Sequence, residues 1–306
     1  MFKTLSKTIS KFVTNFISIL SNKIHNFFWR SKNDFQKNSI ELIDIESFLK
    51  RINIKKGDTL FIHSSWKELK QANFTAKELI EFLIKFLGLE GTLSMPAFPA
   101  NQSKITEFSV KHTPSAAGLL TEIFRRYPGV KRSINLNHSV IALGKHAEFL
   151  VNEHHLSQTA CDEKSPYFKL SKIKNAWIVG FGVGHRLKIA TALHCVECQL
   201  WKTIPYFKKL FSEKKCYNYV DENGLHGEHC YLVRNGAIYT PKLAKYFTKQ
   251  ELIEYEIKGL QLYAIKAPIL IKKSVELGKL GKTMYIWPLP FSWLFKEIKI
   301  VLKSNS

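Results

Sequence analysis

The sequence predicts an α/β fold: an α/β/α sandwich whose central sheet is mainly parallel or mixed, preceded by an amphipathic N-terminal helix. From residue 40 onward, short apolar strands alternate with helical segments, a pattern typical of a sheet covered by helices. Of the 306 residues, 45% are hydrophobic and 13% are aromatic. This is enough apolar material for one large core, and it excludes general disorder.

The first elements can be assigned from caps, turns and apolar runs. In order, they are a helix capped by Asp44 and reaching Ile52, a strand at 59–63, a helix at 76–87 between Thr75 and Gly88, and a strand at 91–96. A loop at 97–112 follows. Thr113, Pro114 and Ser115 then predict the start of a helix that reaches Arg126, because proline is tolerated in a first helical turn.

The second half of the domain continues the alternation. Its predicted elements are strands at 139–143 and 176–180, a glycine-rich turn at 180–184, a helix from Thr191, a strand-rich region at 204–240 and a helix after Thr248. The glycine-rich turn follows a strand but lacks the full dinucleotide-binding pattern, so we do not expect it to bind NAD.

Charge and composition divide the chain into a basic segment at 1–39, the α/β domain at 40–265 and a basic, aromatic tail at 266–306. The formal net charge is +21, and residues 1–40 and 265–306 each contribute +6. Such ends favour an anionic surface, either lipid or nucleic acid. No nucleic-acid-binding motif is recognisable, so we expect no nucleic-acid partner.

The segment at 1–39 has the pattern of an amphipathic helix, with an aromatic face opposite a lysine-rich face. Its apolar runs are shorter than the roughly 18–20 residues needed to cross a membrane. We therefore expect a peripheral helix at the inner face of the membrane, supported by Tyr285, Trp287 and further aromatics of the tail. The alternative is a helix that packs on the protein itself or on a second subunit, as in a homodimer.

Five cysteines in a chain of this length do not form a disulfide scaffold, and their number is odd. Because no secretory leader is recognisable, we expect a cytoplasmic protein with reduced thiols.

The segment from Thr191 to Glu197 carries a catalytic pattern. In a helix, His194 and Glu197 share one face, where a carboxylate can influence an imidazole, and histidine is the usual general base near neutral pH. From the spacing alone, a surface pair without a function is the alternative. No second Cys/His pair has structural-zinc spacing, so we expect no metal.

Three further polar clusters occur where ligands often bind. One ends a strand, one opens a predicted helix whose N–H groups suit phosphate, and one enters a strand. They are His63, Ser64 and Ser65; Thr113, Pro114 and Ser115; and Arg132 and Ser133 with His138 and Ser139. Ordinary caps and turns are the alternative explanation for each.

Taken in their order along the chain, these motifs resemble the aminoglycoside 3-N-acetyltransferase family. The resemblance covers roughly residues 45–200 and extends through the strand-rich part to about 265. It implies the α/β sandwich of that family and an N-acetyltransferase that uses acetyl-CoA and no metal. It also implies that His194 takes a proton from the acceptor amine, that Glu197 orients His194 or raises its basicity, and that the three polar clusters hold CoA.

One departure concerns the loop before the strand at 139–143. The family usually reads Arg-Ser-x-His-Pro-x-His-Ser, whereas this chain has Asn135 and Leu136 in place of His-Pro. Asparagine keeps hydrogen-bonding capacity but cannot titrate, and leucine does not fix the backbone as proline does.

The charge of the chain guides the expected acceptor. Aminoglycosides are polycations and should favour an acidic cleft, whereas this chain is strongly basic. We therefore expect the acceptor to be a nucleotide- or lipid-linked amino sugar of surface-polysaccharide assembly. The alternatives are acetylation of aminoglycosides, which gives antibiotic resistance, and a membrane-docked CoA-binding protein without catalysis.

Overall fold

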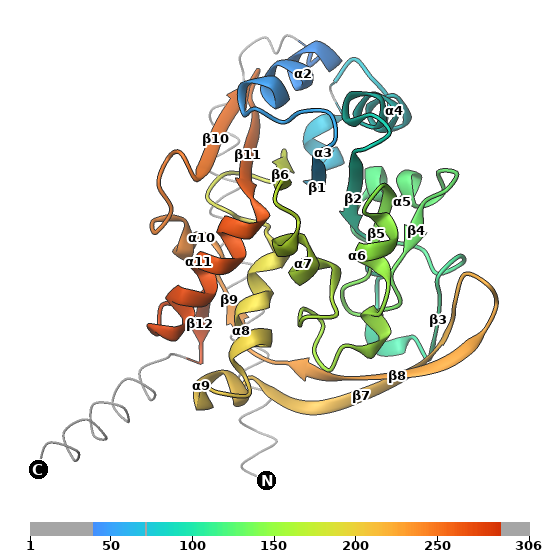
Figure 1. Cartoon of the computed structure of the whole chain (residues 1–306), viewed down its shortest axis with the longest axis vertical. Coiled ribbons are helices and arrows are strands. Elements are labelled where there is room, and N and C mark those ends of the chain that lie inside the picture. The colour runs from blue at the N-terminus through green and yellow to red at the C-terminus, as the bar shows by residue number, and fades with distance from the viewer. Residues whose placement is uncertain (1–38, 71, 289–306) are drawn as a thin grey trace, which may run out of the picture. The chain divides into compact units, whose positions relative to one another are not determined.

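A computed structural model describes residues 39–70 and 72–288 and contains a seven-stranded mixed sheet (Figure 1). The strand order is β10 (Leu252–Ile257), β11 (Leu260–Lys266), β6 (Ala176–Phe181), β1 (Thr59–Ser64), β2 (Thr92–Pro96), β5 (Val140–Gly144) and β4 (Lys131–Arg132). Strand β1 pairs in parallel with β2 and β6, and the other neighbours are antiparallel. The predicted mixed sheet is therefore confirmed.

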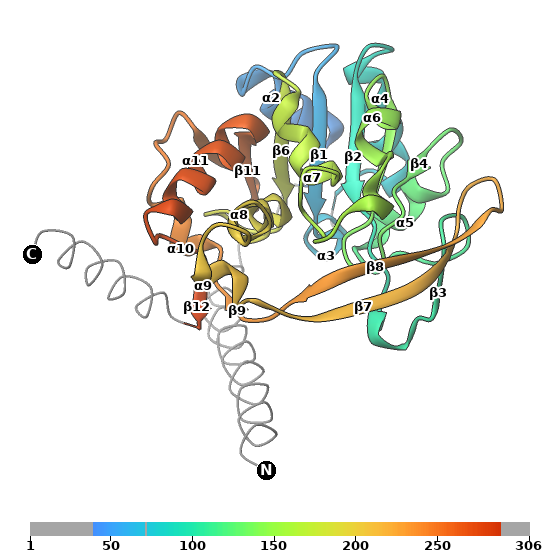
Figure 2. The ribbon, with the colours of Figure 1, turned by 60° about the horizontal axis from the view of Figure 1, so that its bottom comes forward.

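Helices cover both faces of this sheet, and Figure 2 shows β6, β1 and β2 running side by side. Residues from α2 (Leu42–Arg51), α4 (Ala76–Leu87) and α5 (Leu119–Arg125) share one core with Leu60 and Ile62 of β1. Residues from α6 (Ala147–Val151), α7 (Pro166–Lys169), α8 (Cys195–Leu200) and α11 (Ala267–Lys279) share the other core with Phe61. Adjacent residues of β1 therefore belong to different cores, as the two-residue period of a strand requires.

A second sheet joins β3 (Glu107–Ser109), β7 (Phe211–Val220) and β8 (His226–Arg234), the last two forming a long hairpin along the bottom of Figure 1. Its small core contains Phe108, Leu136, Tyr217 and Tyr231. Strands β9 (Ala237–Ile238) and β12 (Tyr285–Trp287) form an antiparallel pair. The short helices are α3 (Trp66–Leu69), α9 (Pro205–Lys208), α10 (Pro241–Ala244), η1 (Gln102–Lys104), η2 (His154–Leu156), η3 (Leu170–Lys172) and η4 (Thr191–His194).

Two helix starts differ from the prediction. The N-cap of α2 is Glu41, and Asp44 is the third helical residue, whose carboxylate accepts the Glu41 N–H at 2.8 Å. Helix α5 begins at Leu119 rather than at the Thr113-Pro114-Ser115 segment. The Thr113 hydroxyl instead accepts the N–H of Ser109 at 2.8 Å and so closes a preceding turn.

The helix predicted after Thr248 is wrong, because this region forms the β10–β11 hairpin. Lys258 and Gly259 have positive φ angles of 49° and 82° and connect the two strands directly. Two such residues form the tight turn that favours a hairpin, and β11 extends the main sheet next to β6.

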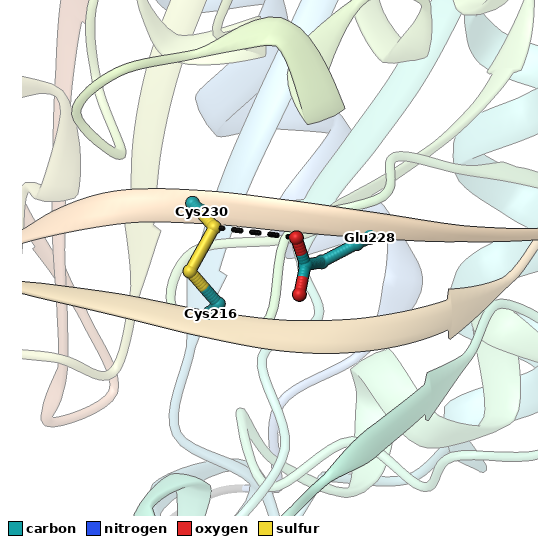
Figure 3. A group of neighbouring side chains, drawn as sticks. All are labelled: Cys216, Glu228 and Cys230. Atoms are coloured by element: carbon teal, nitrogen blue, oxygen red, sulfur yellow. Dashed lines mark hydrogen bonds between the residues drawn. A yellow bond between two sulfur atoms is a disulfide. The ribbon is translucent and has the colours of Figure 1, made fainter.

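The expectation of reduced thiols is wrong for two cysteines. Cys216 of β7 and Cys230 of β8 face each other across the hairpin and form a disulfide (Figure 3). The remaining cysteines, Cys161, Cys195 and Cys198, are free and buried.

The predicted tail at 266–306 begins with α11, which packs in the core through Leu270 and Ile271. Tyr285, expected at a membrane interface, is buried at 1% exposure, whereas Trp287 is exposed. The predicted N-terminal helix and the tail beyond Pro288 lie outside the described residues. Within the described part of the chain, no helix combines the length and the apolar character needed to span a membrane.

Candidate active site

The structure brings His194 and Glu197 into close and buried contact. His194 ends η4 and Glu197 lies in the first turn of α8, so their separation of three positions brings the side chains together. His194 Nδ1 lies 2.6 Å from Glu197 Oε1, and the two residues are 8% and 0% exposed. The pair therefore does not form a solvated surface contact.

This contact sets the tautomer of the imidazole. When Glu197 accepts a hydrogen bond from Nδ1, the neutral ring carries its proton there and leaves the lone pair on Nε2. Burial is the largest cause that lowers the pKa of His194 below 6.5, and the charge of Arg234 lowers it further, against the opposing effect of Glu197. His194 is therefore mostly neutral at pH 7, as a general base must be.

His138 is the second histidine of the site. Its ring stacks on that of His194, with centroids 5.5 Å apart and an interplanar angle of 28°. Its Nδ1 atom is enclosed and finds no hydrogen-bond partner among the described residues. Burial, followed by the charges of neighbouring His194 and Arg234, lowers the pKa of His138 well below 6.5.

The loop that carries His138 is built around the two residues that depart from the family pattern. The side-chain oxygen of Asn135 accepts the N–H groups of Asn137 and His138 at 3.1 and 2.8 Å. Leu136 is fully buried, and its N–H donates to the hydroxyl of Tyr217 at 2.9 Å. Proline could not make this bond, so the sequence change forms part of an ordered loop.

Arg132 and Ser139 hold neighbouring segments of the site in place. The buried guanidinium of Arg132 donates to the carbonyls of Ala97, Val110 and Thr113, and the hydroxyl of Ser139 donates to Ala97 at 2.9 Å. Burial is the main cause that lowers the pKa of Arg132 to about 9. Its Nε atom has no hydrogen-bond partner among the described residues. A role in binding CoA stays a prediction for both residues.

Ser133 connects this loop to a buried histidine. Its hydroxyl accepts the N–H of Val140 at 2.9 Å and lies 2.8 Å from His154 Nδ1. His154 Nε2 lies 3.0 Å from the carbonyl of Ala160, which can only accept, so Nε2 carries the proton and Ser133 donates to Nδ1. Ser133 therefore has a structural role here.

The end of β1 lies beside the segment that carries the catalytic pattern. His63 is 3% exposed, and its Nε2 accepts the N–H of Thr191 at 3.4 Å. Burial lowers the pKa of His63 to about 3, so this acceptor stays neutral. Ring contacts then continue from His63 through Phe61, Tyr167 and His138 to His194.

Ser64 and Ser65 close the same strand end. The N–H of Ser65 donates to the Phe181 carbonyl at 2.9 Å, and Ser65 is the N-cap residue of the four-residue helix α3. A Cβ at Gly118 would lie 3.8 Å from the Ser64 carbonyl oxygen, so α5 begins close to this strand end. The CoA-binding role of the two serines stays a prediction.

The helix-start argument for Thr113, Pro114 and Ser115 is wrong, because these residues precede α5 by several positions. The N–H of Ser115 donates to Glu122 at 2.8 Å and is not free for phosphate. Hydrogen bonds from Arg125 are the largest cause that lowers the pKa of Glu122 to about 2. This segment is held by Glu122, which also pairs with Arg125 and Arg126, and its role in binding CoA stays a prediction.

Two residues of the site could not be found by sequence reasoning. Arg234 at the end of β8 has its Nε 3.7 Å from Glu197 Oε1. Tyr285 of β12 is buried and accepts a hydrogen bond from Arg234 Nη1 at 3.5 Å. Both come from strands far along the chain from Glu197, and no local motif marks either of them.

Among the described residues, side chains of the types that bind metal ions lie close together at one place on the hairpin. Cys216, Glu228 and Cys230 lie together on the hairpin, where Cys230 Sγ is 3.8 Å from a Glu228 oxygen (Figure 3). Because the two sulfur atoms are bonded to each other, they are not thiolate ligands in this structure.

Comparison with known proteins points to one family. A family model described as aminoglycoside 3-N-acetyltransferase matches residues 61–277. The SPbeta prophage-derived aminoglycoside N(3')-acetyltransferase-like protein YokD of Bacillus subtilis (strain 168) is 31% identical over an alignment of 182 residues, which covers 52% of this chain and 64% of that protein. Aminoglycoside N(3)-acetyltransferase IV of Salmonella sp is 27% identical over 158 residues, which are 52% of this chain and 58% of that protein. The matched stretch is thus shorter than two thirds of either relative.

Solved structures show the same fold. Aminoglycoside acetyltransferase AAC(3)-IVa, as a mutant in complex with a gentamicin, superposes with a TM-score of 0.65 and 21% identity, covering 80% of this chain and 91% of that one. AAC-IIIb, in a binary complex with CoASH, gives a TM-score of 0.66 and 17% identity over 80% and 98% of the two chains. Because the family model spans more than half of the sequence, the chain belongs to the aminoglycoside 3-N-acetyltransferase family.

Proposed function

We propose that this protein is an N-acetyltransferase that transfers the acetyl group of acetyl-CoA to an amine of an aminoglycoside, with His194 as general base. The observation that carries the proposal is the buried 2.6 Å contact between His194 Nδ1 and Glu197 Oε1. It leaves Nε2 as the basic atom of a neutral imidazole beside a second neutral histidine. Membership of the family supports the reaction class.

The residues of the site suit a polar ligand such as the pantetheine end of CoA. The Nδ1 of His138 and the Nε of Arg132 are enclosed polar atoms without hydrogen-bond partners among the described residues. Unpaired buried groups of this kind are costly unless a ligand satisfies them. Bound acetyl-CoA would supply the acetyl group as an activated thioester.

The chain's part in the reaction is proton transfer. His194 Nε2 removes a proton from the acceptor amine as the nitrogen bonds to the acetyl carbon and the carbon–sulfur bond breaks. Glu197 holds the ring through Nδ1 and stabilises the imidazolium that forms. The imidazolium then returns the proton to the departing thiolate, so the site is restored.

An aminoglycoside is favoured over a nucleotide- or lipid-linked amino sugar. Both curated relatives described above carry aminoglycoside acetyltransferase names, and AAC(3)-IVa was solved with a gentamicin. The preference for an anionic acceptor came from the charge of the whole chain. More than half of that charge lies in the ends, so it describes the acceptor site poorly.

The test measures thiol release from acetyl-CoA with aminoglycosides in one series and nucleotide-linked amino sugars in the other. We expect release with aminoglycosides, and replacing His194 with Ala should reduce kcat by about 10²–10⁴-fold while CoA still binds. His226→Ala is the matched control, because that histidine is exposed on the hairpin. Thiol release only with nucleotide-linked sugars would reject an aminoglycoside as the acceptor. Turnover by His194→Ala at the wild-type rate would reject His194 as the general base.

A further inference from the structure

The hairpin brings a positive charge to the His194–Glu197 pair. Arg234 Nε lies 3.7 Å from Glu197 Oε1, the same oxygen that accepts the hydrogen bond from His194. The guanidinium also donates to the Tyr285 hydroxyl at 3.5 Å and lies 5.8 Å from the centre of that ring. Glu197 therefore has one basic partner from η4 and another from β8.

Most of the remaining titratable groups near the pair are neutral or weakly acidic side chains. Among the described residues they are Cys161, together with Cys195 and Cys198 from α8, Tyr206 from α9, His138 from the loop before β5 and Tyr285 from β12. Burial is the main cause that raises the pKa of Cys195, Tyr206 and Tyr285 and lowers that of His138. The Glu197 carboxylate and the Arg234 guanidinium form the ion pair of the cluster, and Asp162 is a further carboxylate that acts on Cys195.

We propose that Arg234 is a positioning residue, the counter-ion of Glu197 that keeps the His194 imidazole neutral and its Nε2 free to accept a proton. The proposal rests on the function proposed above. Without Arg234, the buried Glu197 carboxylate would have His194 as its nearest cationic partner. Such a carboxylate favours the imidazolium, which cannot act as a base.

The directions in which the pKa values of Arg234 and His194 are shifted support this role. Burial alone would lower the pKa of Arg234, but the phenol of Tyr285 and the carboxylate of Glu197 outweigh it and raise that pKa. Conversely, Arg234 acts together with burial in lowering the pKa of His194. The guanidinium therefore stays charged, and its charge opposes protonation of the imidazole.

The test follows the titration of His194 by NMR in the resting protein and the acidic limb of kcat/KM in the same variants. In Arg234→Gln, the pKa of His194 and the midpoint of the acidic limb of kcat/KM should both move to higher pH by about one unit. This is the size expected for the loss of a nearby charge. Arg234→Lys should restore most of the wild-type profile because it restores the charge. Arg51→Gln is the matched control, because it removes an exposed guanidinium at the end of α2, which covers the opposite face of the sheet, and should leave the titration of His194 in place.

An unchanged or lowered pKa of His194 in Arg234→Gln would overturn the proposal, as would an equal shift in Arg234→Lys. If Arg234→Gln does not fold, Arg234→Met replaces it, because methionine keeps an apolar stem of similar length. The NMR titration needs no turnover. If His194→Ala kept its activity, the function of His194 as base would fail while the titration would still decide the role of Arg234.

Discussion

His138 stacks on His194, although the two rings come from different elements, the loop before β5 and the helix η4. A proton on His194 lowers the tendency of His138 to gain another, because two positive charges at this distance repel each other. The charge of His194 is accordingly a cause of the low pKa of His138. The pair can therefore hold one proton far more readily than two.

Replacing His138 with Phe should keep the stacked ring and lower kcat/KM about tenfold, the value of one hydrogen bond to a ligand. The reason is that the buried His138 Nδ1 has no hydrogen-bond partner among the described residues, so we expect a bound substrate to supply one. Steady-state kinetics measure this change. His155→Phe, at a half-buried histidine that contacts Tyr219, should leave kcat/KM unchanged. Equal rates for the His138 variant and the wild type would contradict the role of His138.

Activity should decline toward acid pH with a midpoint below 6.5. His194 works in its neutral form, and its pKa in the folded protein lies below that ordinary value. The active form is therefore present above this pKa and is lost as the pH falls through it. Profiles of kcat/KM between pH 4.5 and 8 test this expectation, and a midpoint above 6.5 would contradict it.

Stability should also fall with acid, in part through His154. Burial is the main cause that lowers the pKa of His154 from 6.5 to about 3 in the folded protein. As the pH falls below 6.5, His154 therefore binds a proton in the unfolded chain but not in the folded protein. At pH 5 this difference amounts to about 2 kcal/mol of the free energy of unfolding. Urea unfolding of His154→Gln should show a weaker dependence on pH than the wild type, and an equal dependence would reject the assignment.

The thiol count should distinguish the disulfide from five reduced cysteines. The native protein should react little with Ellman's reagent, because its three free cysteines are buried, and the denatured protein should show three thiols. Reduction should lower the free energy of unfolding by roughly 3 kcal/mol, as expected for a loop of this size. Five thiols in the denatured, unreduced protein would show that Cys216 and Cys230 are not joined.

Asn135→Ala should destabilise the protein by about 1–3 kcal/mol, because it leaves two N–H groups in the loop without their acceptor. It should also lower kcat/KM, since one of these groups belongs to His138. Thermal unfolding and kinetics measure the two effects. Asn223→Ala, in the exposed turn of the hairpin, is the control with no expected effect. A variant as stable and active as the wild type would show that Asn135 does not order the loop.

Apolar runs and helix caps in the sequence correctly predicted the strands and the helix that depend on neighbouring residues alone. The strands at 59–63 and 176–180 follow from continuous apolar runs, and α4 follows from Thr75, whose side chain accepts the N–H of Glu78. The hairpin at 252–266 was missed because the turn at Lys258 and Gly259 is short and its strands are only partly apolar. The helix predicted from Thr113 failed because the segment's hydrogen bonds go to a turn and to Glu122.

The same distinction applies to the site. His194 and Glu197 could be paired from their spacing, because a helix converts three positions into one face. Arg234 and Tyr285 could not, because the hairpin and β12 bring them to Glu197 only after the chain has folded. Likewise, the bond between Leu136 and Tyr217 depends on contact between two sheets and leaves no local signal.

The position of β11 beside β6 has a consequence for synthesis on the ribosome. Strand β6 is complete at Phe181, whereas its neighbour β11 starts at Leu260, about 80 residues later. Until β11 emerges, the fully buried strand β6 has an open hydrogen-bonding edge. Open apolar edges recruit other strands, so nascent chains of this protein should be prone to aggregation in that interval and should depend on chaperones that bind extended apolar segments.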